Sequence, residues 1–281
     1  MKRKLKLTIL TVIILLFVLI VALIIIENNM VQLNKYDVST SKLPSDLNLK
    51  IAHISDFHNT KLKDKALERL AEAEPDIIVV TGDLIDSRKT DVKLSVDFME
   101  KAMKIAPCYY VTGNHESRMP NELNELLASL DELGVTVLRN ESVLLDINGE
   151  KINIIGIDDP KFALRRDSVK GASIVVSGSL EPLISEEYYN LVLCHRPEAF
   201  EVYVECGADL ALCGHAHGGQ IILPLIGGVI APNQGLFPKY YAGLYSEGET
   251  NMIVSRGVGN SLFPFRVNNK PEVILINLKG E

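Results

Sequence analysis

The sequence predicts an α/β protein in which two β-sheets form a sandwich flanked by helices, preceded by one N-terminal transmembrane helix. From Leu49 to Cys213, short apolar segments of strand length alternate with segments whose apolar residues repeat at helical spacing. After Gln220, strand-like segments follow one another without obvious helices between them. We therefore expect the later strands to form a second sheet that packs face to face on the first, within one domain.

Residues 1–26 have the composition of a basic cytoplasmic tip followed by a membrane anchor. Leu7–Ile26 contains only two polar residues, both threonine, and as a helix it spans about 30 Å, the thickness of the hydrocarbon core. The sequence Glu27–Met30 that follows is a poor signal-peptidase site, which favours an uncleaved signal anchor. The basic residues before the span are Lys2, Arg3, Lys4 and Lys6, and the next is Lys35. This asymmetry predicts a single-pass protein of the cell membrane with its N-terminus inside and the remaining chain outside the cytoplasm.

Residues 27–48 are polar, contain Ser, Thr and Pro44, and are interpreted as a stalk. Residues 49–281 then form one domain, long enough for a substantial core. Beyond residue 26 the chain has 25 basic and 36 acidic residues, a net charge of −11. Such an acidic domain argues against nucleic acid as a partner. No protein partner is implied by the sequence.

The elements of the domain can be placed in order from their patterns. Residues 62–73 place Leu62, Ala66, Leu67 and Leu70 on one helical face, and the β-branched run before Thr81 is typical of a buried strand. The predicted helices are Lys63–Ala73, Val92–Ile105, Asn121–Leu133 and Ala199–Glu205. The predicted strands are Leu49–Ser55, Asp76–Val80, Cys108–Val111, Thr136–Leu138, Ser142–Ile147, Ile152–Ile157, Asn190–Cys194, Leu210–Cys213, Ile221–Leu223, Tyr240–Leu244, Met252–Ser255 and Val273–Leu278.

Five of these strands end in Asp, Asn or His. The chain has six histidines, and all except His53 lie within a few residues after an apolar run. Ligands of α/β proteins gather at the carboxyl ends of strands, so we expect these side chains to meet at one edge. The candidate set is Asp56, His58, Asp83, Asn114, His195, His215 and His217, with His115 beside it.

Carboxylate, amide oxygen and imidazole together suit a borderline divalent ion such as Mn²⁺, Fe²⁺ or Zn²⁺. Seven ligands are too many for one tetrahedral site and about right for two ions that share a carboxylate. Two ions about 3.5–4 Å apart can hold a hydroxide and stabilise an in-line displacement at phosphorus. The chain has no Walker-type loop and no Ser or Cys beside a base in a nucleophile context, which favours metal-activated water as the nucleophile. The competing interpretation, chance histidines in polar loops, does not explain their position at strand ends.

Five short motifs stand in order along the chain: Asp-x-His at Asp56, Gly-Asp-x-x-Asp at Gly82, Gly-Asn-His-Glu at Gly113, the lone His195, and Gly-His-x-His at Gly214. With them the chain resembles the calcineurin-like metallophosphoesterase superfamily from about residue 49 to residue 278. The branch it resembles is that of membrane-anchored or exported bacterial phosphodiesterases, which include hydrolases of UDP-diacylglucosamine. The fold of the family, a double β-sandwich flanked by helices, agrees with the two-sheet prediction.

The resemblance implies a role for each candidate residue. It implies that Asp56, His58 and His217 bind a first metal, that Asn114, His195 and His215 bind a second, and that Asp83 bridges the two. It implies that His115 is the general acid or the electrostatic partner of the leaving oxygen. Residues 113–118 also resemble the corresponding motif of phosphoprotein phosphatases, in which the arginine binds phosphate. The other motifs of that group differ from those of this chain. Arg118 is accordingly a candidate phosphate contact, with a solvent-facing helix residue as the alternative.

Other noticeable residues have structural interpretations. We expect His53 to pack in the core, Asp86 to orient its neighbours, Asp158-Asp159-Pro160 to form a turn, and Cys108, Cys194 and Cys213 to be small buried apolar residues. The apolar loop Leu223–Pro232 has two interpretations: it packs between the sheets, or it contacts an acyl chain or the bilayer beside the anchor.

We therefore expect a membrane-anchored, dinuclear metal-dependent phosphoester hydrolase of the phosphodiesterase or pyrophosphatase type. The anchor confines it to the membrane surface, which favours a lipid-linked or cell-envelope substrate. The alternatives are a phosphomonoesterase or protein phosphatase, and a non-catalytic envelope binding protein that retains the metal site.

Overall fold

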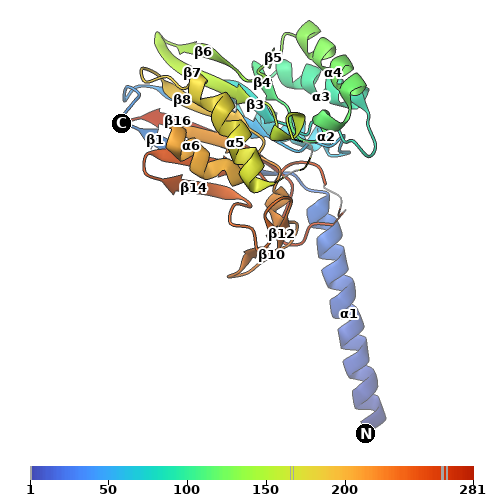
Figure 1. Ribbon diagram of the computed structural model, residues 1–281. Coiled ribbons are helices and arrows are strands. Elements are labelled where there is room, and N and C mark those ends of the chain that lie inside the picture. The colour runs from blue at the N-terminus through green and yellow to red at the C-terminus, as the bar shows by residue number, and fades with distance from the viewer. Residues whose placement is uncertain (1, 165, 167, 261–262, 264) are drawn as a thin grey trace.

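The computed structural model describes residues 2–164, 166, 168–260, 263 and 265–281 (Figure 1). The helices are α1 (Lys2–Asn28), α2 (Lys63–Ala73), α3 (Val92–Met103), α4 (Pro120–Glu132), α5 (Val169–Leu180) and α6 (Phe200–Cys206). The strands are β1 (Gln32–Thr40), β2 (Asn48–Ile54), β3 (Ile77–Thr81), β4 (Cys108–Val111), β5 (Thr136–Val137), β6 (Glu141–Ile147), β7 (Glu150–Ile157), β8 (Tyr189–Cys194), β9 (Leu210–Cys213), β10 (Ile222–Leu223), β11 (Gly227–Gly228), β12 (Ile230–Ala231), β13 (Gly235–Leu236), β14 (Gly243–Glu247), β15 (Thr250–Val254) and β16 (Glu272–Gly280).

Two six-stranded sheets pack face to face and form the centre of the domain. The first has the order β1-β16-β2-β3-β4-β5 and the second the order β14-β15-β9-β8-β7-β6. Side chains of both sheets meet in one buried cluster, to which Ile51 and Val79 contribute from the first sheet and Leu191 and Leu212 from the second. Helices α2–α4 cover the outer face of the first sheet, and α5 and α6 cover that of the second. The predicted α/β sandwich is confirmed.

The central strands are buried on both faces, which explains why they read as continuous apolar runs. In β2, Leu49 and Ile51 point toward the second sheet, while Ala52 and Ile54 point toward the helices. Strands β2, β3, β4 and β5 run parallel, as do β7, β8, β9 and β15. Each parallel block therefore presents its carboxyl ends at one edge.

The expected membership of the second sheet was right for β14 and β15 and wrong for the other strands. Strands β7, β8 and β9 belong to the second sheet together with β14 and β15, whereas β16 lies in the first sheet between β1 and β2. The predicted strand Ile221–Leu223 corresponds to β10, which pairs with β11 in a hairpin outside both sheets. A strand buried on both faces has the same apolar pattern in either sheet, so the pattern does not reveal its partner.

The expected stalk is also corrected by the structure. Residues 32–40 form β1, which pairs in parallel with β16 from Gln32 opposite Glu272 to Thr40 opposite Gly280. As an edge strand, β1 buries only Val38 of its nine residues, and the rest of its composition is that of a polar linker. The folded domain therefore begins with β1, only three residues separate β1 from α1, and the domain does not begin at residue 49.

Helix α5 was not predicted. It contains Gly171, Gly178 and several serines, which are weak helix formers, so its sequence pattern is poor. Ser168 caps it by accepting a hydrogen bond from Gly171 N (3.1 Å), and it buries Val176 and Leu180 against the second sheet. At the other end of the chain, α1 is a candidate membrane span: within residues 4–28 an 18-residue window has a mean hydropathy of 3.7, and none of that window is buried.

Candidate metal centre

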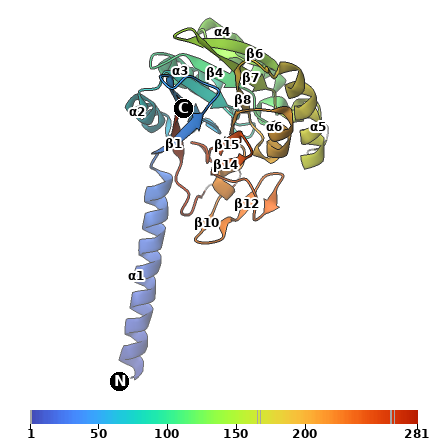
Figure 2. The same ribbon diagram turned by 90° about the vertical axis from the view of Figure 1, so that its left-hand side faces the viewer.

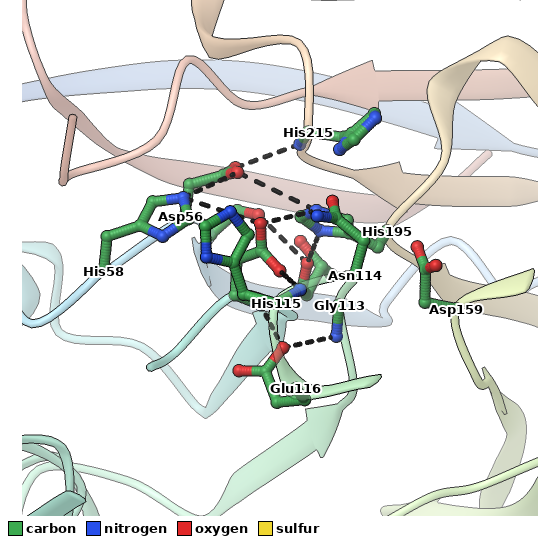
Figure 3. Close-up of polar contacts among 12 residues, drawn as sticks. Asp56, His58, Gly113, Asn114, His115, Glu116, Asp159, His195 and His215 are labelled. Atoms are coloured by element: carbon green, nitrogen blue, oxygen red, sulfur yellow. Dashed lines mark hydrogen bonds and ion pairs between the residues drawn. The ribbon is translucent and has the colours of Figure 1, made fainter. Parts of the chain in front are cut away.

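The polar strand ends of both sheets converge on one site (Figure 3). Asp56 and His58 follow β2, Asp83 follows β3, and Asn114 follows β4, all in the first sheet. His195 follows β8, and His215 and His217 follow β9, all in the second sheet. The seven predicted ligands are thus brought together across the edge of the sandwich, not along the edge of one sheet.

Two buried aspartates form the middle of this site, and each has one oxygen held by a backbone amide. Asp56 Oδ2 accepts a hydrogen bond from His215 N (3.0 Å), and Asp83 Oδ1 accepts one from His115 N (2.7 Å). The second oxygen of each carboxylate faces the imidazoles. Asp56 Oδ1 lies 3.3 Å from His217 Nε2, and Asp83 Oδ2 lies 3.2 Å from His195 Nε2.

The imidazoles form two groups, one with Asp56 and one with Asp83. Asp56, His58 and His217 offer ligand atoms that all lie within 4.8 Å of one another. Asp83, His195 and His215 do the same. His58 Nε2 of the first group is 3.5 Å from Asp83 Oδ2 of the second. His58 Nε2 and His217 Nε2 are 3.3 Å apart, as expected for two lone pairs directed at a common point.

His215 and His217 leave β9 with an unusual backbone conformation. Both lie in the left-handed region, with φ of 65° and 47°, and they join different groups. Asp56, His58 and Asp83 have the same backbone conformation, with φ between 47° and 52°. This conformation costs a non-glycine residue about 1–2 kcal/mol, and such strain is typically found at functional sites.

Two glycines of the motifs are required by close packing. A Cβ on Gly113 would lie 2.3 Å from Asp83 Oδ1, and one on Gly214 would lie 1.8 Å from Ser55 Oγ and 2.5 Å from Asp56 Oδ2. The backbone therefore passes directly over the carboxylates, and any side chain at these two positions would displace them.

The polar atoms at the centre fit a metal ion. Asp56 Oδ1, Asn114 Oδ1 and His195 Nε2 are buried, and within the described part of the chain none has a hydrogen-bond partner. Such groups are costly unless a cation or water binds them. His195 Nδ1 lies 2.7 Å from the carbonyl oxygen of Thr81, which can only accept, so Nδ1 carries a proton and Nε2 is directed at the centre.

The charges of the site are mutually dependent. Burial by itself raises the pKa of Asp56 and of Asp83, but the neighbouring histidines hold both pKa values well below the usual range. Burial favours neutral His195, yet Asp83 and Asp56 raise its pKa to about 10. A metal ion binds by displacing such a proton, since it supplies the positive charge that the carboxylates need. Burial lowers the pKa of His217 to about 3 and, with Arg196, also lowers the pKa of His215, so both rings are neutral and suited to ligation.

Glu116 supports the site and was not predicted as a functional residue. Its buried carboxylate accepts hydrogen bonds from four backbone amides, those of Asp83 (3.0 Å), Leu84 (2.7 Å), Ile85 (3.1 Å) and Gly113 (2.9 Å). Burial and Asp83 raise the pKa of Glu116 to about 7, while the amides act in the opposite direction. Glu116 thus ties the loop after β3 to the loop after β4 (Figure 3). Its place in the Gly-Asn-His-Glu motif was the only signal.

Arg196 is a second supporting residue that sequence reasoning missed. Its guanidinium is fully buried, 2.8 Å from Asp159 Oδ1 and 3.1 Å from His215 Nε2. Asn233 Nδ2 lies 3.2 Å from the same His215 nitrogen. Arg196 therefore orients the His215 ring through Nε2, and links Asp159, expected to be a plain turn residue, to the metal centre. The sequence feature that could have identified Arg196 is its position directly after the candidate ligand His195.

His115 adjoins the ligand groups but is oriented differently. Its Nδ1 accepts a hydrogen bond from Ser87 N (3.0 Å), so the proton of the neutral ring lies on Nε2. Its position also permits a third group with His58 and Asp83, within 4.8 Å. A proton on Nε2 favours a donor over a metal ligand. Arg118 is exposed at the end of the short 3₁₀ turn Glu116–Arg118.

The remaining residues have the structural roles that were expected. His53 is fully buried, with Nε2 2.7 Å from Thr81 Oγ1. Asp86 orients its surroundings, since its Oδ1 accepts from Arg88 N (2.8 Å) and lies 3.4 Å from His115 Nδ1. Cys108, Cys194 and Cys213 are buried free thiols.

A profile of the calcineurin-like phosphoesterase family matches residues 49–219, which include all seven ligand candidates. The chain belongs to this family. It is accordingly a metal-dependent phosphoester hydrolase, and the family's use of divalent metals agrees with the donor set described above.

Relatives of known name agree with the family. The phosphodiesterase YaeI of Escherichia coli (strain K12) is 31% identical over 230 residues, 80% of this chain and 78% of that protein. The metallophosphoesterase YkoQ of Bacillus subtilis (strain 168) is 32% identical over 82% of this chain and 84% of that protein. A transmembrane protein with metallophosphoesterase domain from Bos taurus is 30% identical, covering 87% of this chain and 56% of that protein. These relatives do not test the finer resemblance to hydrolases of UDP-diacylglucosamine, which stays a prediction.

Among solved structures, TT1561 of Thermus thermophilus is similar with a TM-score of 0.50 over 75% of this chain and 90% of that chain. At 12% identity this likeness shows the fold alone.

Proposed function

We propose that this family member is a dinuclear phosphodiesterase. Asp56, His58 and His217 would hold one divalent ion, Mn²⁺, Fe²⁺ or Zn²⁺. The second would be held by Asn114, His195 and His215, with Asp83 shared by both. The observation that carries the proposal is Asp83 Oδ2, which lies 3.5 Å from His58 Nε2 and 3.2 Å from His195 Nε2. A carboxylate oxygen between two groups of ligands has the position that a bridging ligand requires.

Two ions in such a site, when bound, neutralise the phosphate oxygens and activate water. The chain's own residues do the rest. The amides of His215 and His115 fix the two carboxylates, so the ligand oxygens are preorganised before substrate arrives. His115, with its proton on Nε2, would stabilise the departing oxygen as a hydrogen-bond donor, and as an imidazolium it would transfer that proton and return to the neutral ring. The exposed Arg118 is a candidate contact for a phosphate oxygen.

The substrate we propose is a lipid-linked or cell-envelope phosphodiester or pyrophosphate. Support comes from α1, which would hold the domain at the membrane, and from the phosphodiesterase name of one relative. The basic residues at the start of α1, before its apolar part, favour an N-terminus inside and a catalytic domain outside the cytoplasm. A phosphomonoesterase is the alternative, and the comparison of bis(p-nitrophenyl) phosphate with p-nitrophenyl phosphate separates the two.

The test is Asp83→Asn in the full-length protein, with Asp131→Asn as the matched control, since Asp131 is an exposed residue of α4. Metal content and diester turnover are measured in detergent. We expect Asp83→Asn to lower the metal content and abolish turnover, because an amide cannot bridge two cations as a carboxylate does. Two ions per chain together with near-normal turnover in Asp83→Asn would show that the dinuclear assignment is wrong.

A further inference from the structure

An uncharged apolar segment projects from the domain beside the membrane anchor. Residues 218–238 contain no Asp, Glu, Lys or Arg, although the chain beyond residue 26 has a net charge of −11. They form two hairpins, β10–β11 and β12–β13, on the side of the domain from which α1 leaves, as both views show (Figures 1 and 2). A surface of this composition is unusual for an acidic domain that meets only water.

The apolar side chains of these hairpins point outward. Those that are exposed are Leu223, Leu225, Ile226, Ile230, Leu236 and Phe237. Leu225 is fully exposed, and Leu225 and Phe237 have φ of 67° and 54°, where glycine or asparagine would fit with less strain. Leu225 and Phe237 are therefore large apolar residues at positions where neither the backbone conformation nor burial in the core favours such a residue. Of the two expectations for Leu223–Pro232, packing between the sheets is wrong.

A second exposed pair lies close to the end of α1. Phe263 and Phe265 are 50% and 54% exposed, with ring centroids 6.0 Å apart. Phe265 lines a cavity of about 380 Å³ together with Ile24, Ile25 and Asn28 of α1, and His58 of the metal centre lines the same cavity. One candidate ligand, His58, thus borders a space that has the end of the anchor as one wall.

The anchor is joined to the domain by specific contacts. Asn28 Nδ2 donates to the carbonyl oxygen of Arg266 (2.7 Å), and Arg266 N donates to Asn28 Oδ1 (2.9 Å). Val31 is buried in the first core cluster, and Gln32 N donates to Pro271 O (2.8 Å). With only three residues between α1 and β1, the direction of α1 determines which face of the domain meets the bilayer.

We propose that residues 222–237 with Phe263 and Phe265 form a membrane-docking surface that inserts into the lipid leaflet beside α1. The cavity between α1 and His58 then admits a phosphoester whose apolar part remains in that leaflet. The docking rests on α1 as a membrane span, and the substrate class rests in addition on the proposed function. The bilayer is the occupant that the geometry favours, because α1 and the hairpins lie on the same side of the domain and Phe265, which contacts Phe263, lies beside the end of α1. None of the exposed side chains named is charged.

Tryptophan fluorescence tests the docking without reference to catalysis. The chain contains no tryptophan, so each introduced indole is a single reporter. Phe237→Trp reports the docking surface, Phe17→Trp in α1 is the control inside the bilayer, and Leu144→Trp on β6 is the exposed control away from it. The full-length variants are reconstituted in phosphatidylcholine vesicles with and without a doxyl-labelled phosphatidylcholine.

We expect Phe237→Trp and Phe17→Trp to be blue-shifted and quenched by the doxyl lipid, and Leu144→Trp to be neither. Emission of Phe237→Trp that is solvent-like and unquenched would overturn the proposal. Blue-shifted emission without quenching would also overturn it, since protein and not lipid would then cover the residue. An unquenched Phe17→Trp would overturn it too, because the anchor itself would not be in the bilayer.

A second measurement addresses the substrate class. In the double variant Leu225→Ser/Phe237→Ser, we expect the turnover of a vesicle-embedded lipid phosphodiester, relative to that of soluble bis(p-nitrophenyl) phosphate, to fall about tenfold or more. An unchanged ratio would overturn the entry of substrate from the leaflet. Wild-type protein that turned over neither diester would contradict the proposed function instead, while the fluorescence result would stand by itself.

Discussion

Glu116→Gln is the sharpest test of how the metal centre is held in place. The wild-type carboxylate accepts four backbone N–H bonds, from Asp83 and Gly113 on Oε2 and from Leu84 and Ile85 on Oε1. A glutamine has almost the same shape but only one acceptor oxygen. Its NH₂ group would therefore face two of the four amides, donor against donor.

The expected cost follows from those two lost bonds. Glu116 is fully buried, so water cannot replace the missing acceptor. An unsatisfied buried donor costs about 1–3 kcal/mol, which gives about 2–6 kcal/mol for the variant. Since the affected amides belong to Asp83 and to the loop that precedes Asn114, we also expect weaker metal binding and a large loss of diester turnover.

Denaturant unfolding in detergent measures the change in the free energy of unfolding, and turnover is measured at saturating metal. Glu100→Gln is the control, because Glu100 makes one ion pair, with Lys104 at 2.8 Å on the surface of α3, and its loss should cost less than about 1 kcal/mol. If Glu116→Gln unfolded at the wild-type denaturant concentration and kept its activity, the carboxylate would not be what connects the two loops.

Three further predictions concern the donor, the metals and the topology. His115→Ala should lower the turnover of alkyl phosphodiesters about 10²–10⁴-fold, lower that of substrates with a p-nitrophenolate leaving group much less, and leave the metal content unchanged. Equal losses on both substrates would contradict the general-acid role. A loss of metal would show that His115 is a ligand. Removal of the metals by a chelator should lower the thermal unfolding midpoint, because ions at about 100 times their dissociation constant stabilise the folded state by about 2.7 kcal/mol per site, and an unchanged midpoint would contradict the metal centre. A reporter that is active only in the cytoplasm should be inactive when fused after Glu281, and its activity would reverse the proposed topology.

The identity of the candidate ligands could be predicted because each motif is local. Asp56, Asp83 and His195 follow apolar strands directly, and a strand end is recognisable from a few neighbouring residues. The backbone conformations of the candidate ligands could not be predicted in this way. The left-handed conformation of His215 and His217 depends on contacts such as the bond from His215 N to Asp56 Oδ2, between residues 159 positions apart.

The supporting residues were missed for the same reason. Glu116 and Arg196 are charged residues beside motif positions, and nothing local distinguishes a buried carboxylate or guanidinium from an exposed one. Burial of each becomes favourable only when distant partners arrive: the amides of residues 83–85 for Glu116, and Asp159 and His215 for Arg196.

The sequence by itself determined the α/β class, an N-terminal apolar helix long enough to span a membrane, the order of most helices and strands, and the residue types that gather at the strand ends. These properties follow from periodicity, length and composition, which act over one element at a time. Tertiary structure alone decided that β7, β8 and β9 lie in the second sheet, that residues 32–40 form an edge strand, and that the hairpins after β9 lie outside the core. The physical reason is that apolar side chains pack well against many partners. Which strands become neighbours therefore depends on the packing energy of the whole core, and the pattern of any single segment does not determine it.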